Sequence, residues 1–280
     1  MNDNWIVDNL NNALATWNGK LTEIWSLVSQ SPETFKGGTI WGTIVNIHQA
    51  LQAVGYGLLI LFFAMGVFKS AASFREFRRP EQALRLFIRF LMTKVAISSG
   101  MEIMSTIFTI CGGIVSTIAS NMGALTTTAA TLPTEIVDAV EAVTFLESIP
   151  LWLVSFLGSL FITVLSFIMI LTVYGRFFKL YLFTALAPIP LATFGGEGTS
   201  QSGRTFIKSY VGVCMEGAVI VLACLIYSAF LSSGTTGLPN TGTTAVTMVW
   251  AYLGETVFNM LILVGLVKGA DHVVKEIFGT

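Results

Sequence analysis

Apolar segments long enough to cross a membrane are the feature that most constrains this chain. A transmembrane helix needs about 20 apolar residues, because the hydrocarbon is about 30 Å thick and a helix rises about 1.5 Å per residue. Five segments meet this requirement, at about residues 44–68, 95–120, 149–175, 209–232 and 246–268. The pattern predicts an all-α polytopic membrane protein with about five transmembrane helices.

The composition leads to the same class. The chain is 54% hydrophobic and only 11% charged, whereas about a quarter of the residues of a soluble globular protein are charged. Too few polar side chains are present to cover a water-facing surface. We therefore expect lipid to cover much of the protein.

Basic residues set the expected orientation. Those between the first two spans are Lys69, Arg75, Arg78, Arg79, Arg85, Arg89 and Lys94, whereas residues 121–148 contain no Lys or Arg. Lys and Arg near the ends of spans stay preferentially in the cytoplasm. We therefore expect a cell-membrane protein with its N-terminus outside and its C-terminus cytoplasmic. This orientation places every basic residue except Lys20 and Lys36 on the cytoplasmic side.

A sixth apolar run, residues 180–194, is too short to span and contains Pro188 and Pro190. A full crossing here would place Arg204 and Lys208 outside or invert the later spans. We interpret the run as the cytoplasmic end of the third span followed by a proline-broken or re-entrant segment. Irregular backbone at membrane depth is tolerated only when protein or water covers it, so this segment is a candidate for buried or functional structure.

The N-terminal residues differ from the rest of the chain. Apolar residues recur there at spacings of three and four, which form one face of a helix: Ile6, Leu10, Leu14, Trp17, Leu21, Ile24, Trp25 and Val28. We expect residues 1–38 to contain an extracytoplasmic amphipathic helix on the outer membrane surface, with packing against a neighbouring subunit as the alternative. Residues 39–280 then form the transmembrane helical domain.

Residues 81–94 are also amphipathic, since Leu84, Phe87 and Leu91 share a stripe. They are interpreted either as a cytoplasmic extension of the second span or as a helix in the inner interface. The candidate cytoplasmic contacts are Arg78, Arg79, Arg85, Arg89 and Lys94. They serve either as a topology signal that contacts anionic lipid or as a site for nucleic-acid phosphates.

Three acidic residues lie within predicted spans: Glu102, Glu216 and Glu255. A charge at the centre of a membrane helix costs roughly 2.5–3.5 kcal/mol, so each is expected to line a polar pathway or to form interhelical hydrogen bonds. The three cysteines, Cys111, Cys214 and Cys224, lie in apolar runs with no metal-ligand spacing and no evident disulfide partner. No catalytic constellation is visible, so the sequence predicts neither an enzyme nor a cofactor.

Residues 198–205, Gly-Thr-Ser-Gln-Ser-Gly-Arg-Thr, nearly match a phosphate-binding loop. That motif requires a lysine where Arg204 stands, and it must follow a strand and open a helix. We interpret the stretch as a flexible cytoplasmic loop, with Gly195, Gly196 and Gly198 permitting tight turns.

Two stretches carry a family resemblance. Residues 174–198, YGRFFKLYLFTALAPIPLATFGGEG, and 206–217, FIKSYVGVCMEG, resemble the TrbL-type polytopic subunit of conjugative type IV secretion systems, in the version on integrative conjugative elements of Gram-positive bacteria. The family-like residues are Arg176, Lys179, Pro188, Pro190, Gly195, Gly196, Glu197 and Gly198.

The resemblance implies a structural channel component that forms a homo-oligomeric ring at the base of a conduit for single-stranded DNA with its attached relaxase. Its implied partners are other secretion subunits, cytoplasmic ATPases and membrane lipids. Residues 121–148 form a shorter outer loop than in longer relatives. The alternative function is a small-solute membrane transporter or channel, motivated by the three intramembrane acids and the proline-broken helix.

Overall fold

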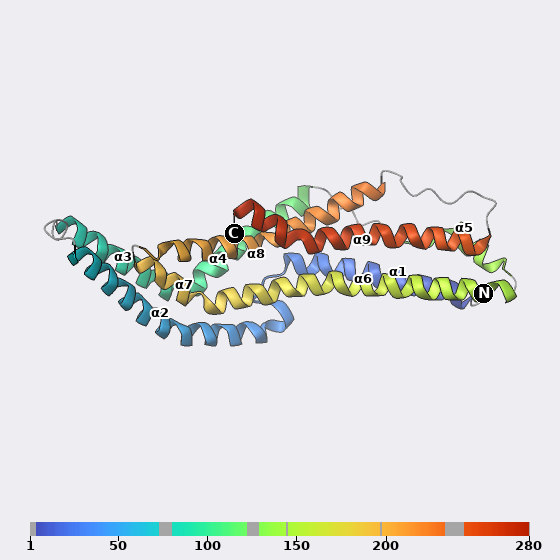
Figure 1. The fold of residues 1–280 in the computed structure, drawn as a ribbon. Helices are drawn as coiled ribbons and strands as arrows, with labels where there is room; N and C mark the ends of the chain where they lie inside the picture. The colour runs from blue at the N-terminus through green and yellow to red at the C-terminus, as the bar shows by residue number, and fades with distance from the viewer. Residues whose placement is uncertain are drawn as a thin grey trace. The chain divides into compact units, whose positions relative to one another are not determined.

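The fold, seen in a computed structural model, is entirely helical in the part of the chain that the structure describes (Figure 1). The described residues are 4–72, 80–121, 129–143, 145–196, 198–232 and 244–279. The elements in chain order are α1 (Trp5–Ser29), η1 (Phe35–Gly38), α2 (Thr39–Ala72), α3 (Pro80–Ser98), α4 (Gly100–Asn121), α5 (Thr134–Glu141), α6 (Phe145–Leu186), α7 (Pro188–Ala192), η2 (Thr193–Gly195), α8 (Ser200–Ser232) and α9 (Ala245–Phe278). This confirms the predicted all-α class.

Five of the helices are long and apolar enough to cross a membrane, and they correspond to the five predicted spans. They cover Phe35–Lys69, Gly100–Ser120, Ser148–Leu186, Ser200–Leu231 and Ala245–Phe278. The second begins at Gly100 rather than at residue 95, because α3 ends at Ser98. Backbone hydrogen bonds from Ser99 N to Val95 O and from Ile103 N to Ser99 O still join α3 to α4.

The predicted break in the apolar run 180–194 is confirmed, and the structure locates it. Helix α6 continues to Leu186, and α7 starts at Pro188. Proline has no N–H to donate to the helical ladder, and Ala187 before Pro188 still has helical backbone angles. The helical turn resumes when Leu191 N donates to Ala187 O. The first half of the run therefore extends the third span, and whether the rest is re-entrant stays a prediction.

The chain forms two compact units. Unit 1 comprises the described residues of Met1–Ser29, Val115–Tyr174 and Ala218–Ala270, and unit 2 those of Gln30–Ile114, Gly175–Gly217 and Asp271–Thr280. The boundaries fall inside α4, α6, α8 and α9. This division differs from the expected boundary at residue 38, because each of these long helices contributes to both units.

In unit 1, α1 runs parallel to α6. The rings of Trp5 and Trp152 stack with centroids 5.6 Å apart, Asn9 Nδ2 donates to Ser159 Oγ, and further along Tyr174 OH donates to Glu23 Oε1.

The predicted apolar face of α1 is buried by the chain itself. Trp17 and Ile24 are each only 1% exposed, although Trp25 is half-buried. Protein thus covers the face that was expected to meet the outer membrane surface or a neighbouring subunit. The α6 side chains that meet α1 lie far away in sequence, so a local pattern gave no sign of them.

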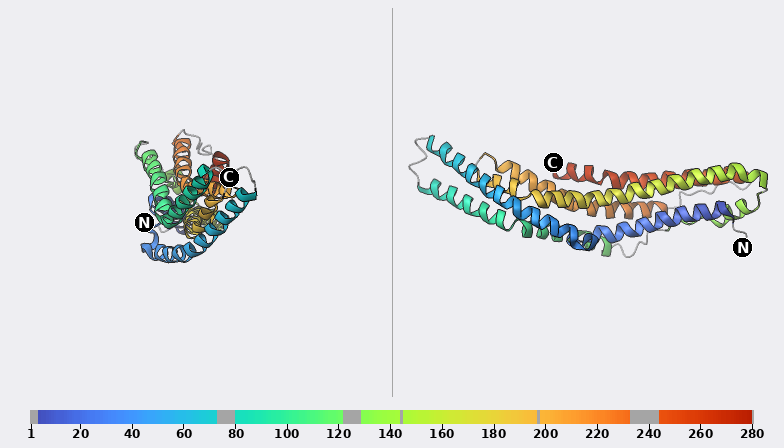
Figure 2. Two further views of the ribbon diagram at one scale, coloured as in Figure 1. Left: turned by 90° about the vertical axis from the view of Figure 1, so that its left-hand side faces the viewer. Right: turned by 90° about the horizontal axis from the view of Figure 1, so that it is seen from below.

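In unit 2, α3 runs antiparallel to the second half of α2, as the right-hand view of Figure 2 shows. Gln52 Nε2 donates to Ile97 O, and the rings of Phe63 and Phe90 lie 4.9 Å apart. The predicted amphipathic helix at 81–94 therefore exists. It is separated from α4 at Ser99 and lies against α2.

The proline-broken segment packs on α2 within unit 2. Gly55 lies so close to α7 that a Cβ at this position would be 2.8 Å from Pro188 O. Gly195 is similarly close to Leu59. Glycine at these two positions allows the irregular backbone to be covered by a neighbouring helix, as irregular structure at membrane depth requires.

Candidate functional site

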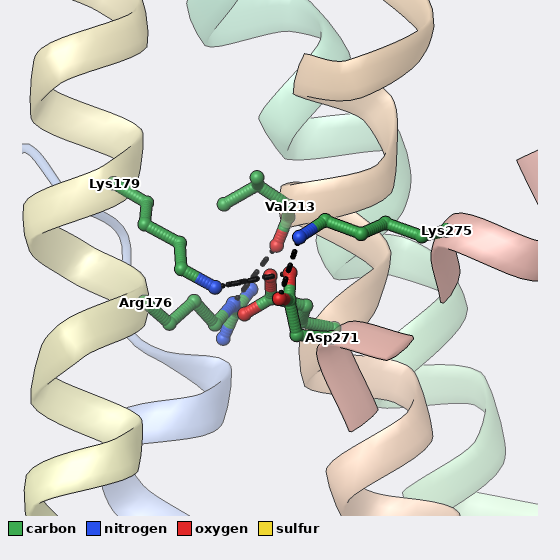
Figure 3. A network of polar contacts seen from close by, with 6 residues as sticks. Arg176, Lys179, Val213, Asp271 and Lys275 are labelled. Carbon is green, nitrogen blue, oxygen red and sulfur yellow. Dashed lines mark hydrogen bonds and ion pairs between the residues drawn. The ribbon is translucent and has the colours of Figure 1, made fainter. Parts of the chain in front are cut away.

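A cluster of charged side chains joins three helices of unit 2 (Figure 3). Helix α6 supplies Arg176 and Lys179, α8 supplies Glu216, and α9 supplies Asp271 and Lys275. We call these five residues the charge cluster. Two of them, Asp271 and Lys275, were not predicted as site residues, because they follow the last predicted span and read as ordinary cytoplasmic charges.

Arg176 is the buried member of the charge cluster, with only 1% of the residue exposed. Its Nε donates to Val213 O at 3.3 Å, and its Nη2 donates to Cys214 O at 3.1 Å. Its guanidinium carbon lies 5.8 Å from the centroid of the Phe108 ring, within the range of a cation–π interaction. The α8 backbone therefore satisfies donors that water would satisfy on a protein surface.

Lys179 connects the other two helices. Its ammonium lies 3.1 Å from Glu216 Oε1 and 3.0 Å from Asp271 Oδ1. Asp271 also pairs with Lys275, one turn further along α9, at 2.9 Å. The Glu216 side chain is 7% exposed and that of Lys179 is 41% exposed, so the pair has one buried and one partly solvated partner.

The charge cluster can hold helices together, and its groups are already occupied with one another. The carboxylate of Glu216 would be costly to bury without Lys179, because an uncompensated buried charge is strongly destabilising. Of the two roles predicted for Glu216, this geometry favours interhelical pairing. Among the described residues, no group of His, Cys, Asp and Glu side chains is arranged to hold a metal ion.

The three predicted intramembrane acids lie in different surroundings. Glu216 belongs to the charge cluster, Glu102 is exposed in the first turn of α4, and Glu255 is half-buried on α9 in unit 1.

The predicted basic contacts lie on or near α3. Arg85 and Lys94 are exposed and Arg89 is half-buried, whereas Arg78 and Arg79 lie outside the described residues. The exposed side chains are available for an external partner, and no contact in the structure identifies that partner.

The family-like segment is built for close packing. Gly195 and Gly196 are buried, and a Cβ on either would lie 2.5 Å or less from a side-chain atom. Pro188 is buried, Pro190 is half-buried, and Gly198 is exposed. Glu197 lies outside the described residues.

The expectation of a flexible loop over residues 198–205 was wrong from Ser200 onwards, because α8 begins there. Thr199 and Ser200 are residues typical of a helix N-terminus, and the polar residues that follow suit a helix as well as a loop. The element before α8 is the 3₁₀ turn η2 rather than a strand, so the phosphate-binding-loop interpretation fails structurally as well.

A polar groove of about 740 Å³ lies in unit 2 between α4 and the start of α2. Its polar lining includes Glu33, Gln49, Gln52, Glu102, Ser105 and Thr109. Ser105 Oγ donates to a carboxylate oxygen of Glu33. The sequence analysis identified only Glu102 of these residues. The spacing of hydroxyl residues along 102–120 would have pointed to Ser105 and Thr109, whereas nothing in the sequence pointed to Glu33, Gln49 and Gln52.

Two of the cysteines lie in the same part of the core. Cys111 of α4 and Cys214 of α8 belong to one buried cluster. All three cysteines are buried and free, as expected of small apolar side chains. The proximity of two of them depends on the packing of α4 against α8, which sequence spacing does not reveal.

A family model described as "TrbL/VirB6 plasmid conjugal transfer like protein" matches residues 17–188, more than half of the 280-residue chain. No curated protein matches the chain, and no solved structure does. The match covers α2 to α6, whereas the resemblance noted in the sequence lay in residues 174–217. The two overlap over residues 174–188, which include Arg176 and Lys179.

Proposed function

The chain belongs to the TrbL/VirB6 plasmid conjugal transfer-like family, and from this membership we propose that several copies form a ring at the base of a conduit for single-stranded DNA and its relaxase. Membership makes the protein a multi-pass membrane component of conjugal transfer, and a structural subunit rather than an enzyme. The ring, the DNA and the Gram-positive integrative conjugative element setting are the proposed refinements.

The exposed face of α6 supports self-association. Large apolar side chains are exposed along this helix from Ile149 to Leu186, a distance of about 55 Å at 1.5 Å per residue. A hydrocarbon layer of about 30 Å covers only about 39 Å of helix even at a tilt of about 40°. Part of the face therefore needs a protein cover, and a neighbouring copy in a ring would supply it.

The distribution of basic residues supports the proposed orientation. Arg85, Arg89 and Lys94 lie on α3, whereas α5 carries only acidic charges. Since basic residues stay preferentially in the cytoplasm, we propose an external N-terminus and a cytoplasmic C-terminus. The basic residues would then meet arriving DNA, a relaxase or a cytoplasmic ATPase.

Deletion of the gene tests the role in transfer. An in-frame deletion should abolish mating while leaving nicking by the relaxase intact, and the wild-type gene supplied in trans should restore mating. Transfer at the wild-type frequency without the protein would refute the proposal. The purified protein should form a closed ring with an open axis. A monomer with a central site would instead support the small-solute transporter.

A further inference from the structure

Helix α4 has two faces of opposite character. Its buried face consists of large apolar residues and one cysteine: Met104, Phe108, Cys111 and Val115. Its exposed surface in unit 2 contains a stripe of polar or small residues at spacings of three and four, Glu102, Thr106, Thr109 and Gly113, beside the exposed Ile110 and Ile114. We call this stripe the α4 polar face. It lies on a helix that is long and apolar enough to span a membrane.

Lipid is a poor neighbour for this face. Thr109 Oγ1 already donates to Ser105 O within the helix, but the carboxyl group of Glu102 has no such partner in its own backbone, and acidic residues in membrane helices face protein or water. Exposed positions on α6, which lipid or a neighbouring copy would cover, differ from it, since Leu160, Val164 and Phe167 are all large and apolar. The contrast indicates that the two exposed faces meet different surroundings.

The groove indicates that these surroundings are aqueous. Gln49 and Gln52 of α2 extend the α4 polar face sideways, and together they line an open space of about 740 Å³. No atom lies within 4 Å of a Cβ placed on Gly112 or Gly113. The lining of the groove also includes Trp41, Val45 and Ile110, but water fills an open groove of this volume wherever polar side chains offer hydrogen-bond partners.

We propose that the α4 polar face and this groove line the aqueous passage of the assembled ring. This inference rests on the proposed function, because it requires several copies around one axis. It also predicts how the wall of the passage interacts with the phosphates of DNA. Residues 100–121 contain no Lys or Arg, so the wall offers hydroxyl groups and a carboxylate but no ion pairs to phosphates. A polyanion would pass such a wall without being held, since basic contacts supply most of the sequence-independent affinity for DNA.

Cysteine accessibility tests the assignment. In a background where the three native cysteines are replaced by alanine and the protein still inserts into the membrane, Thr106→Cys, Thr109→Cys and Gly113→Cys are each treated with a membrane-impermeant, charged methanethiosulfonate. Matched controls are Leu160→Cys and Val164→Cys on the exposed face of α6. The thiolate is the reacting species and needs water, so we expect modification of the α4 positions to be faster by about tenfold or more.

Two outcomes would overturn the proposal. Modification of α4 no faster than that of the α6 controls would mean that lipid covers the face. Protection from the reagent, together with disulfides between copies at Thr109→Cys or Gly113→Cys under copper-phenanthroline oxidation, would make the face a contact between copies. Labelling is read without mating, so the two proposals fail separately. A labelled α4 in a protein whose deletion leaves mating unchanged would support an aqueous passage while refuting the role in conjugation.

Discussion

Gly217 of α8 leaves the space that the guanidinium of Arg176 occupies. A Cβ on Gly217 would lie 2.7 Å from the guanidinium carbon and from both of its terminal nitrogens. Arg176 is buried and bonded to the carbonyls of Val213 and Cys214, so it has no room to retreat without losing those bonds. The glycine and the arginine therefore form one structural feature, contributed by α8 and α6.

Replacing this glycine should weaken the fold. Gly217→Ala overpacks a fully buried site, and we expect it to destabilise the protein by about 1–3 kcal/mol. The midpoint of thermal unfolding in detergent measures the loss. Gly175→Ala is the matched control, because it adds the same methyl group next to Arg176 in sequence with no atom within 4 Å. It should be neutral or stabilise α6 by up to about 1 kcal/mol. Equal midpoints for the two variants would contradict the packing described.

Lys179 should matter more than Lys275. Lys179→Met leaves the buried Glu216 without its cation. We expect this change to lower the free energy of unfolding by an amount toward the lower end of about 3–5 kcal/mol, because Lys179 is partly solvated. The double variant Lys179→Met/Glu216→Gln should recover much of the loss, because no charge is then left unpaired. Lys275→Met removes one exposed pair and should cost less than about 1 kcal/mol. A double variant no more stable than Lys179→Met would contradict this account. Thermal midpoints in detergent provide the comparison.

The packing of the proline-broken segment on α2 gives a prediction with a control two residues away. A Cβ on Gly55 meets the Pro188 carbonyl at 2.8 Å, whereas one on Gly57 meets no atom within 4 Å. We expect Gly55→Ala to lower stability by about 1–3 kcal/mol, because backbone atoms cannot move aside as a side chain does. Gly57→Ala should leave the unfolding midpoint unchanged or raise it. A tolerated Gly55→Ala would mean that α7 does not rest on α2.

The basic residues around α3 should affect DNA transfer. Replacing Arg78, Arg79, Arg85 and Arg89 by glutamine should reduce mating frequency while the protein still inserts, because phosphate contacts would be lost. Replacing the same four by lysine keeps the charge and should preserve most of the transfer. A reporter fused to the C-terminus shows whether the orientation of the wild-type protein is kept. Inversion or degradation of the glutamine variant would mean that the basic residues act only as a topology signal.

The sequence predicted the parts of the fold that depend on local properties. Hydropathy located all five long helices, because the need for about 20 apolar residues is imposed by the bilayer and not by neighbouring helices. The prolines located the break after Leu186, because proline has no N–H to donate to the helical ladder.

Features that depend on distant parts of the chain escaped prediction. The sequence did not indicate that α1 packs on α6. It also gave no sign that Gly217 leaves space for Arg176, because the two residues lie on different helices. Asp271 reads as a solvated charge until Lys179 is seen to reach it. The start of α8 was missed for a different reason, since the polar residues from Ser200 onwards suit both a helix and a loop.

The pairing of α2 with α3 places two distant parts of the sequence at the same depth in the membrane. Phe63 lies against Phe90, and Gln52 donates to Ile97. Arg89, which precedes Phe90, therefore lies at the same depth in the membrane as the middle of α2. If that part of α2 lies in hydrocarbon, the guanidinium must reach toward the headgroups along its own stem or be neutralised within the protein. Quenching of one fluorescent label on α2 by brominated lipids would thus measure the depth of an arginine on α3 as well.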